Sequence, residues 1–324
     1  MIRQDTLSEA PEELQPDIAG GQRNWLRKVI ADSTQAKVGL IVLTIFVLIS
    51  IFAPLLAPYD PRTQVGPVYA PPSLHHPLGL DDGGVDMVSL LIYGGRISLI
   101  VGFAASLVAM LIGGGIGIFS GYFGGRTDQV LMRTTDYFLV IPDLPLAIII
   151  AAVWGPSLQH LIFVIAILLW TTTARIIRAQ VKSVRERVYV KRARSLGASD
   201  WRIITRHVLP QIGPLLIANT VLTIAVAIFD ETALAFLGLA NPTSISWGTL
   251  IEFSFLRTAA SSGYWWAVIP AGLCVALVIM ACFWFGQAIE DALNPRLKVS
   301  YVSPWSFRLR PVPRSVPREE GATV

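Results

Sequence analysis

Long uncharged apolar runs alternate along the chain with short polar segments. A helix of about 20 apolar residues crosses a hydrocarbon core of about 30 Å. We therefore expect membrane-spanning helices over residues 38–56, 97–123, 137–154, 158–174, 212–236 and 266–289. Six spans predict an all-α membrane protein whose two ends lie on the same side of the membrane.

Composition agrees with a membrane class. Of the 324 residues, 53% are hydrophobic and only 15% are charged, whereas soluble domains carry about 25% charged residues. The formal net charge is +4, which on its own would suit a nucleic-acid partner. The basic residues instead cluster in loops beside the apolar runs, where they set topology. We expect contact with membrane lipid and no nucleic-acid partner.

Both ends of the chain are expected to be cytoplasmic tails. Residues 1–37 form a polar tail and lead-in, and basic residues just before the first apolar run favour an inside N-terminus. The first run begins too late and is too long for a cleavable signal peptide. Residues 298–324 are rich in Pro and Arg and are expected to be disordered. The six-span domain then covers residues 38–297.

The loop over residues 175–210 is strongly basic. From Arg175 to Arg206 it holds ten Lys or Arg residues against two acids, and this bias predicts a cytoplasmic position. Good helix formers predict a helix over residues 189–196, ended by Gly197 in a left-handed C-cap. Ser199 or Asp200 is expected to N-cap a second helix that begins near residue 201.

The second helix of this loop is predicted to be amphipathic. Its apolar face would contain Trp201, Ile203, Ile204 and Val208. Pro210 either ends this segment or lies in the first turn of the next span. A short amphipathic element beneath a membrane domain suits docking into the groove of a partner.

The residues Gly197-Ala198-Ser199-Asp200, followed by Ile203, Ile204, His207, Leu209 and Pro210, resemble the EAA loop of ABC-importer permease subunits. The resemblance implies a coupling helix that sits in a cleft of an ATPase subunit. The residues expected to contact the ATPase are Lys191, Ala193, Gly197, Ala198, Ser199, Asp200, Ile203 and Leu209. Where the family reads Glu-Ala-Ala, this chain reads Lys191-Arg192-Ala193. We therefore expect a more acidic ATPase groove, or basic side chains directed to lipid headgroups.

Residues 58–93 are expected to form an external loop. Within it, HPLGLDDGGVD at 76–86, continuing to LIYGGRISL, is similar to the C-type permeases for dipeptides and oligopeptides. The resemblance implies contact with an external binding protein through Asp81, Asp82 and Asp86, although a merely solvated loop is the alternative. Val85 replaces an Arg of the family, which puts an expected salt bridge in doubt. His75 and His76 are adjacent and have no further ligand nearby, so we predict no metal site.

The fifth apolar run contains two acids, Asp230 and Glu231. An acid at the centre of a spanning helix costs about 2.5–3.5 kcal/mol. These side chains either line the translocation path near its outer gate or pair with a charge on a neighbouring subunit. ETALAFLGL at 231–239, SWG at 246–248 and DALNPRL at 291–297 also resemble C-type permease motifs.

Small residues are frequent in the second apolar run, which contains Gly102, Gly113, Gly114, Gly115, Gly117 and Gly121. They predict close helix packing, with a gating hinge as the alternative. Cys274 and Cys282 lie in one apolar run. On one helix they would be about 12 Å apart, which is too far for a disulfide, so we expect packing roles.

No catalytic motif is present in the sequence. It contains no GxxxxGK[ST] phosphate loop, no HExxH and no GxSxG. We expect this chain to be a non-catalytic subunit that binds no cofactor itself. ATP and magnesium are expected in a partner ATPase.

The motifs together resemble a type I ABC-importer permease, the C-type subunit of a dipeptide or oligopeptide system in the inner membrane of a prokaryote. The resemblance implies half of a translocation pathway, a second B-type permease, one or two ATPase subunits and an external binding protein. Nickel, glutathione and sugar importers of the same family remain alternatives. An ion-driven secondary transporter would need inverted repeats and more intramembrane acids, and an intramembrane enzyme would need the motifs that are missing.

Overall fold

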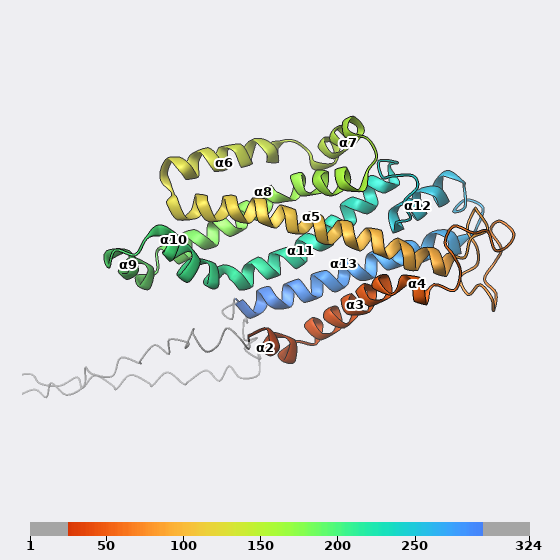
Figure 1. The fold of residues 1–324 in the computed structure, drawn as a ribbon, viewed down its shortest axis with the longest axis horizontal. Helices are drawn as coiled ribbons and strands as arrows, with labels where there is room; N and C mark the ends of the chain where they lie inside the picture. The colour runs from red at the N-terminus through yellow and green to blue at the C-terminus, as the bar shows by residue number, and fades with distance from the viewer. Residues whose placement is uncertain (1–24, 294–324) are drawn as a thin grey trace, which may run out of the picture. The chain divides into compact units, whose positions relative to one another are not determined.

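The computed structural model describes residues 25–293, in which the regular secondary structure is helical apart from one isolated bridge between Leu80 and Asp86. Most of the expected N-terminal tail and all of the expected tail at 298–324 lie outside the described residues. The helices (Figure 1) are α2 Trp25–Asp32, α3 Thr34–Ile51, α4 Ala53–Leu56, α5 Met87–Phe123, α6 Gly125–Val140, α7 Asp143–Trp154, α8 Leu158–Arg185, α9 Val188–Ser195, α10 Asp200–Ile203, the π-helix η1 Ile204–Val208, α11 Leu209–Phe236, α12 Trp247–Leu256 and α13 Trp265–Leu293.

Five helical segments in the described part of the chain are long and apolar enough to cross a membrane. They are α3, α5, α8, the continuous segment Asp200–Phe236 and α13. The pair α6 and α7 passes the same test together but is bent by 87° at its break, which gives up to six spans. The predicted all-α membrane class is therefore confirmed, and the third span is where the prediction is least accurate.

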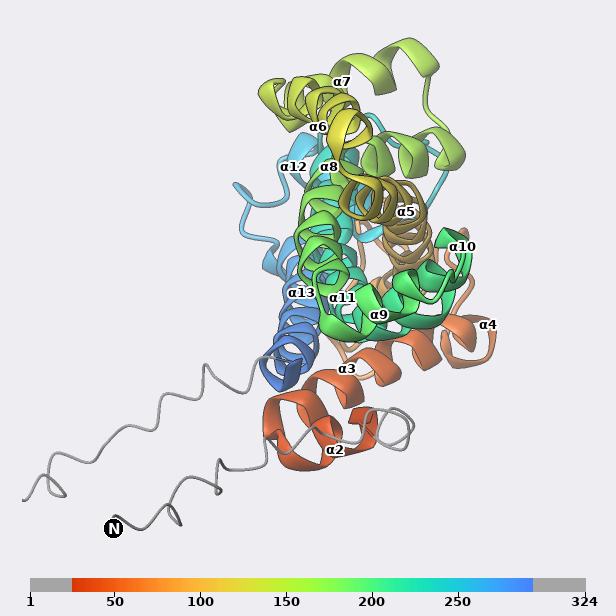
Figure 2. The ribbon, with the colours of Figure 1, turned by 90° about the vertical axis from the view of Figure 1, so that its left-hand side faces the viewer.

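The helices form a bundle built around α5. Along this helix pack α8 and α11, and α11 also packs against α13, which in turn contacts α3. Figure 2 shows α2 and α3 at one edge of the bundle and α6 and α7 at the opposite edge. Residues 57–86, here named the cap, and residues 186–208, here named the basic loop, lie at opposite ends of the bundle (Figure 1). These ends are called the cap end and the basic end below.

The ends of two helices differ by several residues from the apolar runs that predicted them. The first helix begins at Thr34, where the Ser33 side chain accepts a hydrogen bond from the Ala36 amide, and it ends at Ile51 before the short α4. The fourth helix does not stop at residue 174 but continues to Arg185. Part of the segment expected to be a loop is therefore a helical extension beyond the apolar run.

The second and third spans also differ from the prediction. α5 begins at Met87, not at residue 97, because Asp86 caps it. The third span is not one straight helix, since residues 141 and 142 are extended, as expected before and at a proline. α7 has 12 residues, about 18 Å of helix, which is too short to span alone. Asp143 is the first residue of α7.

A row of glycines lets α5 and α8 approach closely. A Cβ placed at Gly117 would lie 2.7 Å from the Ala174 carbonyl oxygen, and one at Gly121 would lie 2.8 Å from the Arg178 carbonyl oxygen. Gly113 faces the Trp170 carbonyl in the same way. The predicted close packing is confirmed at these positions.

The two cysteines are free thiols, as expected. Cys282 is buried in an apolar cluster with Trp247 and Val278, and Cys274 packs against the same cluster. Both therefore fill space between α5, α11, α12 and α13.

Candidate functional site

The basic loop has the local geometry that its sequence predicts. α9 ends before Gly197, which has φ of +79°, a left-handed conformation that favours glycine. The Ser199 side chain accepts a hydrogen bond from the Arg202 amide at 3.4 Å and caps α10. The C-cap prediction is confirmed, and of the two N-cap candidates the structure selects Ser199.

The second helix of the loop does not end but runs into the next span. α10 passes through the π-helix η1 into α11, so that Pro210 lies in the first turn of α11. Ile203, Ile204 and Val208 are buried as predicted, but Trp201 is 68% exposed and is not on the buried face. Trp201 lies in α10, ahead of the π-helix that contains Ile204 and Val208, and this change of helix type was not visible in the sequence.

A polar contact ties the basic loop to the end of α5. Tyr122 donates a hydrogen bond to Asp200 Oδ1 at 2.6 Å. The Arg194 guanidinium lies over the Tyr122 ring, 5.4 Å from its centroid. Below this contact, Ile203 and Val190 are buried in one apolar cluster with Tyr122. α9, α10 and α5 are therefore held together at the basic end.

The expected docking residues divide into exposed and buried sets. Gly197, Ser199, Asp200 and Lys191 are exposed, and the Lys191 ammonium contacts Glu186 at 2.9 Å, which lowers the pKa of the Glu186 carboxyl. Half-buried within the loop cluster are Ala193, Ala198 and Leu209, and fully buried in it is Ile203. The buried residues hold the shape of the loop, and the exposed ones form its surface.

Large apolar side chains are exposed around this loop. They are Val188, Tyr189, Leu196 and Trp201. Exposed basic residues alternate with them along the same loop, namely Lys191, Arg192, Arg194 and Arg202. Exposed apolar side chains rimmed by charge are typical of a protein interaction surface. This set, here named the docking surface, includes residues outside the motif that the sequence indicated.

Asp128 on α6 joins three helices at the basic end, and sequence reasoning missed it. Its carboxylate accepts hydrogen bonds from Ser120 on α5 at 2.5 Å, from Arg178 on α8 at 2.5 and 2.7 Å, and from Lys182 at 2.7 Å. Asp128 is only 8% exposed. The stretch 125–136 holds two arginines and two acids, so nothing in it distinguished Asp128, whose partners are distant in sequence.

We expect Asp128→Asn to destabilise the protein strongly, because it leaves Arg178 and Lys182 without their counter-charge. Removing one partner of a buried ion pair destabilises a protein by at least about 3 kcal/mol. Because Lys182 is partly exposed, we expect a loss of at most about 3 kcal/mol here. The midpoint of thermal unfolding in detergent should fall by up to roughly 5–10 °C. Asp136→Asn is the control, since its ion pair with Arg175 is exposed and contributes less than about 1 kcal/mol. Equal shifts in the two variants would contradict this role of Asp128.

Glu231 is fully buried between α5, α11 and the start of α12. Its Oε2 accepts a hydrogen bond from Ser98 at 3.0 Å, and Ser98 in turn accepts one from the Trp247 amide at 3.2 Å. Among the described residues, no cation pairs with Glu231, and its Oε1 has no hydrogen-bond partner. Asp230 is half-buried and interacts electrostatically with Asp143 at the start of α7. Glu231 therefore links α11 to α5 through a buried hydrogen bond, whereas Asp230 remains partly exposed.

We expect Glu231→Gln to retain assembly and turnover within about twofold, because glutamine can still accept the Ser98 hydrogen bond and carries no charge to bury. Glu231→Leu should lower the yield of assembled protein, since it removes the acceptor of Ser98. Assembly and transport per assembled complex are measured separately. A large fall in turnover for Glu231→Gln, with assembly intact, would instead place Glu231 in the translocation path.

The three cap acids that were expected to contact a binding protein each have a partner within this chain. Asp86 is 0% exposed and accepts hydrogen bonds from the Ser89 amide and hydroxyl at 2.9 Å, while His76 Nδ1 lies 2.9 Å from its other oxygen. Asp81 accepts from two backbone amides, and burial raises the pKa of its carboxyl. The partner of Asp82 is Arg257. Asp86 is therefore not on the surface where a binding protein was expected to contact it.

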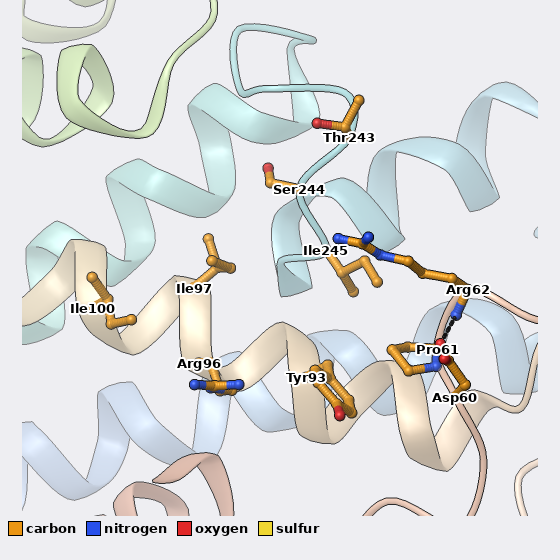
Figure 3. A pocket seen from close by; sticks show the side chains of 10 residues that line it. All are labelled: Asp60, Pro61, Arg62, Tyr93, Arg96, Ile97, Ile100, Thr243, Ser244 and Ile245. Carbon is orange, nitrogen blue, oxygen red and sulfur yellow. Dashed lines mark hydrogen bonds between the residues drawn. The ribbon is translucent and has the colours of Figure 1, made fainter. Parts of the chain in front are cut away.

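A cavity of about 460 Å³ lies beside the cap, between α5 and the loop before α12. Figure 3 shows Arg62 extending from the cap toward Ile245, while Arg96 and Tyr93 come from α5. An adjoining apolar cavity of about 310 Å³ also contains Arg96 in its lining. Sequence reasoning missed this site, although an arginine directly before a charge-free apolar run was a signal for it.

Comparison with known proteins gives consistent matches. The family model described as "Binding-protein-dependent transport system inner membrane component" matches residues 113–299, and "N-terminal TM domain of oligopeptide transport permease C" matches residues 33–72. The chain is 36% identical to the dipeptide transport system permease protein DppC of Alkalihalophilus pseudofirmus, over 84% of this chain and 89% of the relative. It is 32% identical to DppC of Bacillus subtilis, over 92% of each. It is 35% identical to the oligopeptide transport system permease protein OppC of Bacillus subtilis, over 81% and 86%.

Proposed function

The chain belongs to the binding-protein-dependent permeases of ABC importers, as a C-type subunit of the dipeptide and oligopeptide systems, and from this we propose how its two ends contribute to transport. It is a multi-pass, non-catalytic permease of a peptide importer. Members of this family function with a second permease, an ATPase and a substrate-binding protein.

The basic end is proposed to lie in the cytoplasm, with both termini, and the cap end outside the inner membrane of a bacterium. The bias of basic residues toward the 186–208 end supports this orientation. The chain would then form half of the translocation pathway, beside a B-type permease, with Asp230 near its outer part. ATP and magnesium would be bound by one or two ATPase subunits and not by this chain.

The docking surface is proposed to sit in a groove of the ATPase. The observation that carries this proposal is the set of exposed apolar side chains, with Leu196 at 87% and Trp201 at 68% exposure, rimmed by basic residues. Such anchors are typical of the centre of an interface. The basic rim, with Lys191 and Arg192 in place of the family's Glu-Ala, would require an acidic groove on the partner.

The same loop supplies a mechanical connection to the membrane. α10, η1 and α11 form one continuous helical segment over Asp200–Phe236, so a displacement of the docked loop would move the spanning helix directly. The hydrogen bond from Tyr122 to Asp200 would pass the displacement to α5 as well. ATP binding in the partner would thereby shift the population between outward-open and inward-open states.

Uptake by the complete complex in proteoliposomes tests the function. With the binding protein outside and ATP inside, we expect accumulation of a labelled dipeptide that stops when ATP is replaced by a non-hydrolysable analogue. Uptake driven by an ion gradient without ATP would contradict the ABC mechanism. ATP-driven uptake of nickel or a sugar, with none of peptide, would keep the mechanism and contradict the peptide substrate.

A further inference from the structure

Two guanidinium groups line the cavity beside the cap. Arg96 comes from the first half of α5, and Arg62 comes from the cap (Figure 3). No acidic side chain in the described range 25–293 forms an ion pair with either of them. The one carboxylate in the lining, Asp60, accepts a hydrogen bond at 2.8 Å from the Arg62 backbone amide, and this contact holds the turn of the cap. The cavity thus has two cations that form no ion pair with any residue of the range 25–293.

A charged side chain at the position of Arg96 is energetically unfavourable. It directly precedes the charge-free apolar run at 97–123, at the outer boundary of a spanning helix. An ionisable residue at this place is expected to serve a ligand, a lipid or another subunit. Tyr93, Thr243 and Ser244 line the same cavity and add hydroxyl groups to it. The lining is therefore suited to an anionic group of small size.

We propose that Arg96 binds the terminal carboxylate of the peptide at the outer mouth of the translocation path, with Arg62 adding positive charge to the same cavity, an assignment that rests on the peptide-import function proposed above. A guanidinium has a planar fork of N–H donors that matches a carboxylate. The adjoining cavity shares Arg96 and Ile100 with the first and is lined by Val47, Leu99 and Phe103. A peptide held by its carboxylate at Arg96 can place an apolar side chain in this second cavity.

Photo-cross-linking in the assembled complex tests the proposal. A photoreactive amino acid replaces Ile100, which lines both cavities, and the probes are a radiolabelled dipeptide and its C-terminal amide at millimolar concentration, without binding protein. We expect the dipeptide to label the permease at least tenfold more than the amide does. Arg96→Gln should reduce dipeptide labelling at least tenfold, and Arg96→Lys should retain part of it. Arg126→Gln, an exposed arginine at the other end of the bundle, is the charge-matched control and should change nothing.

Three outcomes would overturn the proposal. Equal labelling by dipeptide and amide would mean that the carboxylate is not recognised. Loss of the second permease from the Arg96→Gln complex before irradiation would mean that Arg96 pairs with an acid of that subunit. Cross-linking of Ile100 variants to phospholipid alone would mean that Arg96 serves a headgroup. ATP-dependent uptake is measured on the same preparation, so that a failure of the import function is distinguished from a failure of this site.

Discussion

Replacing Gly117 with valine is expected to prevent accumulation of a stable folded chain. A Cβ at Gly117 would lie 2.7 Å from the Ala174 carbonyl oxygen and 2.9 Å from the Ile177 Cβ. The first of these atoms belongs to the backbone of α8, which cannot move aside as a flexible side chain does. Overpacking a core side chain costs about 1–3 kcal/mol. Moving α5 and α8 apart along their row of glycines would also remove the packing contacts that hold the two helices together in lipid.

Gly115 supplies a control for this prediction on the same helix. A Cβ at Gly115 meets no heavy atom within 4 Å. Gly115→Val therefore changes the helix propensity in the same way as Gly117→Val but introduces no steric clash with α8. The chain is expressed alone, extracted in detergent and measured by size-exclusion profile and thermal unfolding. We expect an aggregated profile or little protein for Gly117→Val and a monodisperse peak for Gly115→Val. Similar profiles for the two variants would show that the close packing of α5 against α8 at Gly117 is not needed for folding.

Replacing Gly197 with proline is expected to remove the ATPase from the purified complex and to leave the membrane helices folded. Gly197 has φ of +79°, whereas proline fixes φ near −65°. The Gly197 amide also donates a hydrogen bond to the Arg194 carbonyl at 3.0 Å, and proline has no such donor. The loop would therefore leave its present course, and Leu196 and Trp201 would no longer share one surface.

Alanine at the same position is the milder comparison. No heavy atom lies within 4 Å of a Cβ at Gly197, so Gly197→Ala costs only the strain of a left-handed residue, about 1–2 kcal/mol. With a tag on this chain, we expect at least tenfold less ATPase to co-purify with Gly197→Pro, while the second permease is retained. Gly197→Ala should keep most of the ATPase. Full retention of the ATPase by the proline variant would argue against docking through this loop.

Local features of the fold were predictable because their causes are local. Gly197 at a helix end and Ser199 before the next helix determine cap geometry through their own φ angle and side chain. Apolar runs long enough to cross a bilayer identified five spanning segments without knowledge of packing. Their ends were less predictable, because α5 starts ahead of its apolar run through the buried cap formed by Asp86. The π-helix at Ile204–Val208 and the exposure of Trp201 were likewise not predictable from the apolar periodicity.

The remaining site features depend on contacts between residues far apart in sequence. Asp128 meets Arg178 and Lys182 only after α6 and α8 have packed together. Glu231 is buried against Ser98 from another helix, so its acidity alone did not distinguish a helix joint from a pathway residue. Arg96 lines a cavity that also requires residues of the cap and of the loop before α12, and these segments are distant from it in sequence. Single-sequence patterns do not encode such distances.

Photo-cross-linking from position 196 in living cells would test whether the basic loop docks on the ATPase. Leu196 is 87% exposed on the docking surface, and Leu74, at 101% exposure in the cap, is a probe at the opposite end. A photoreactive residue replaces each in turn, and the adducts are identified by mass. The structure predicts an adduct of the ATPase subunit from position 196 and none from position 74. An adduct with an external protein from position 196, or an ATPase adduct from position 74, would contradict both the orientation and the coupling role.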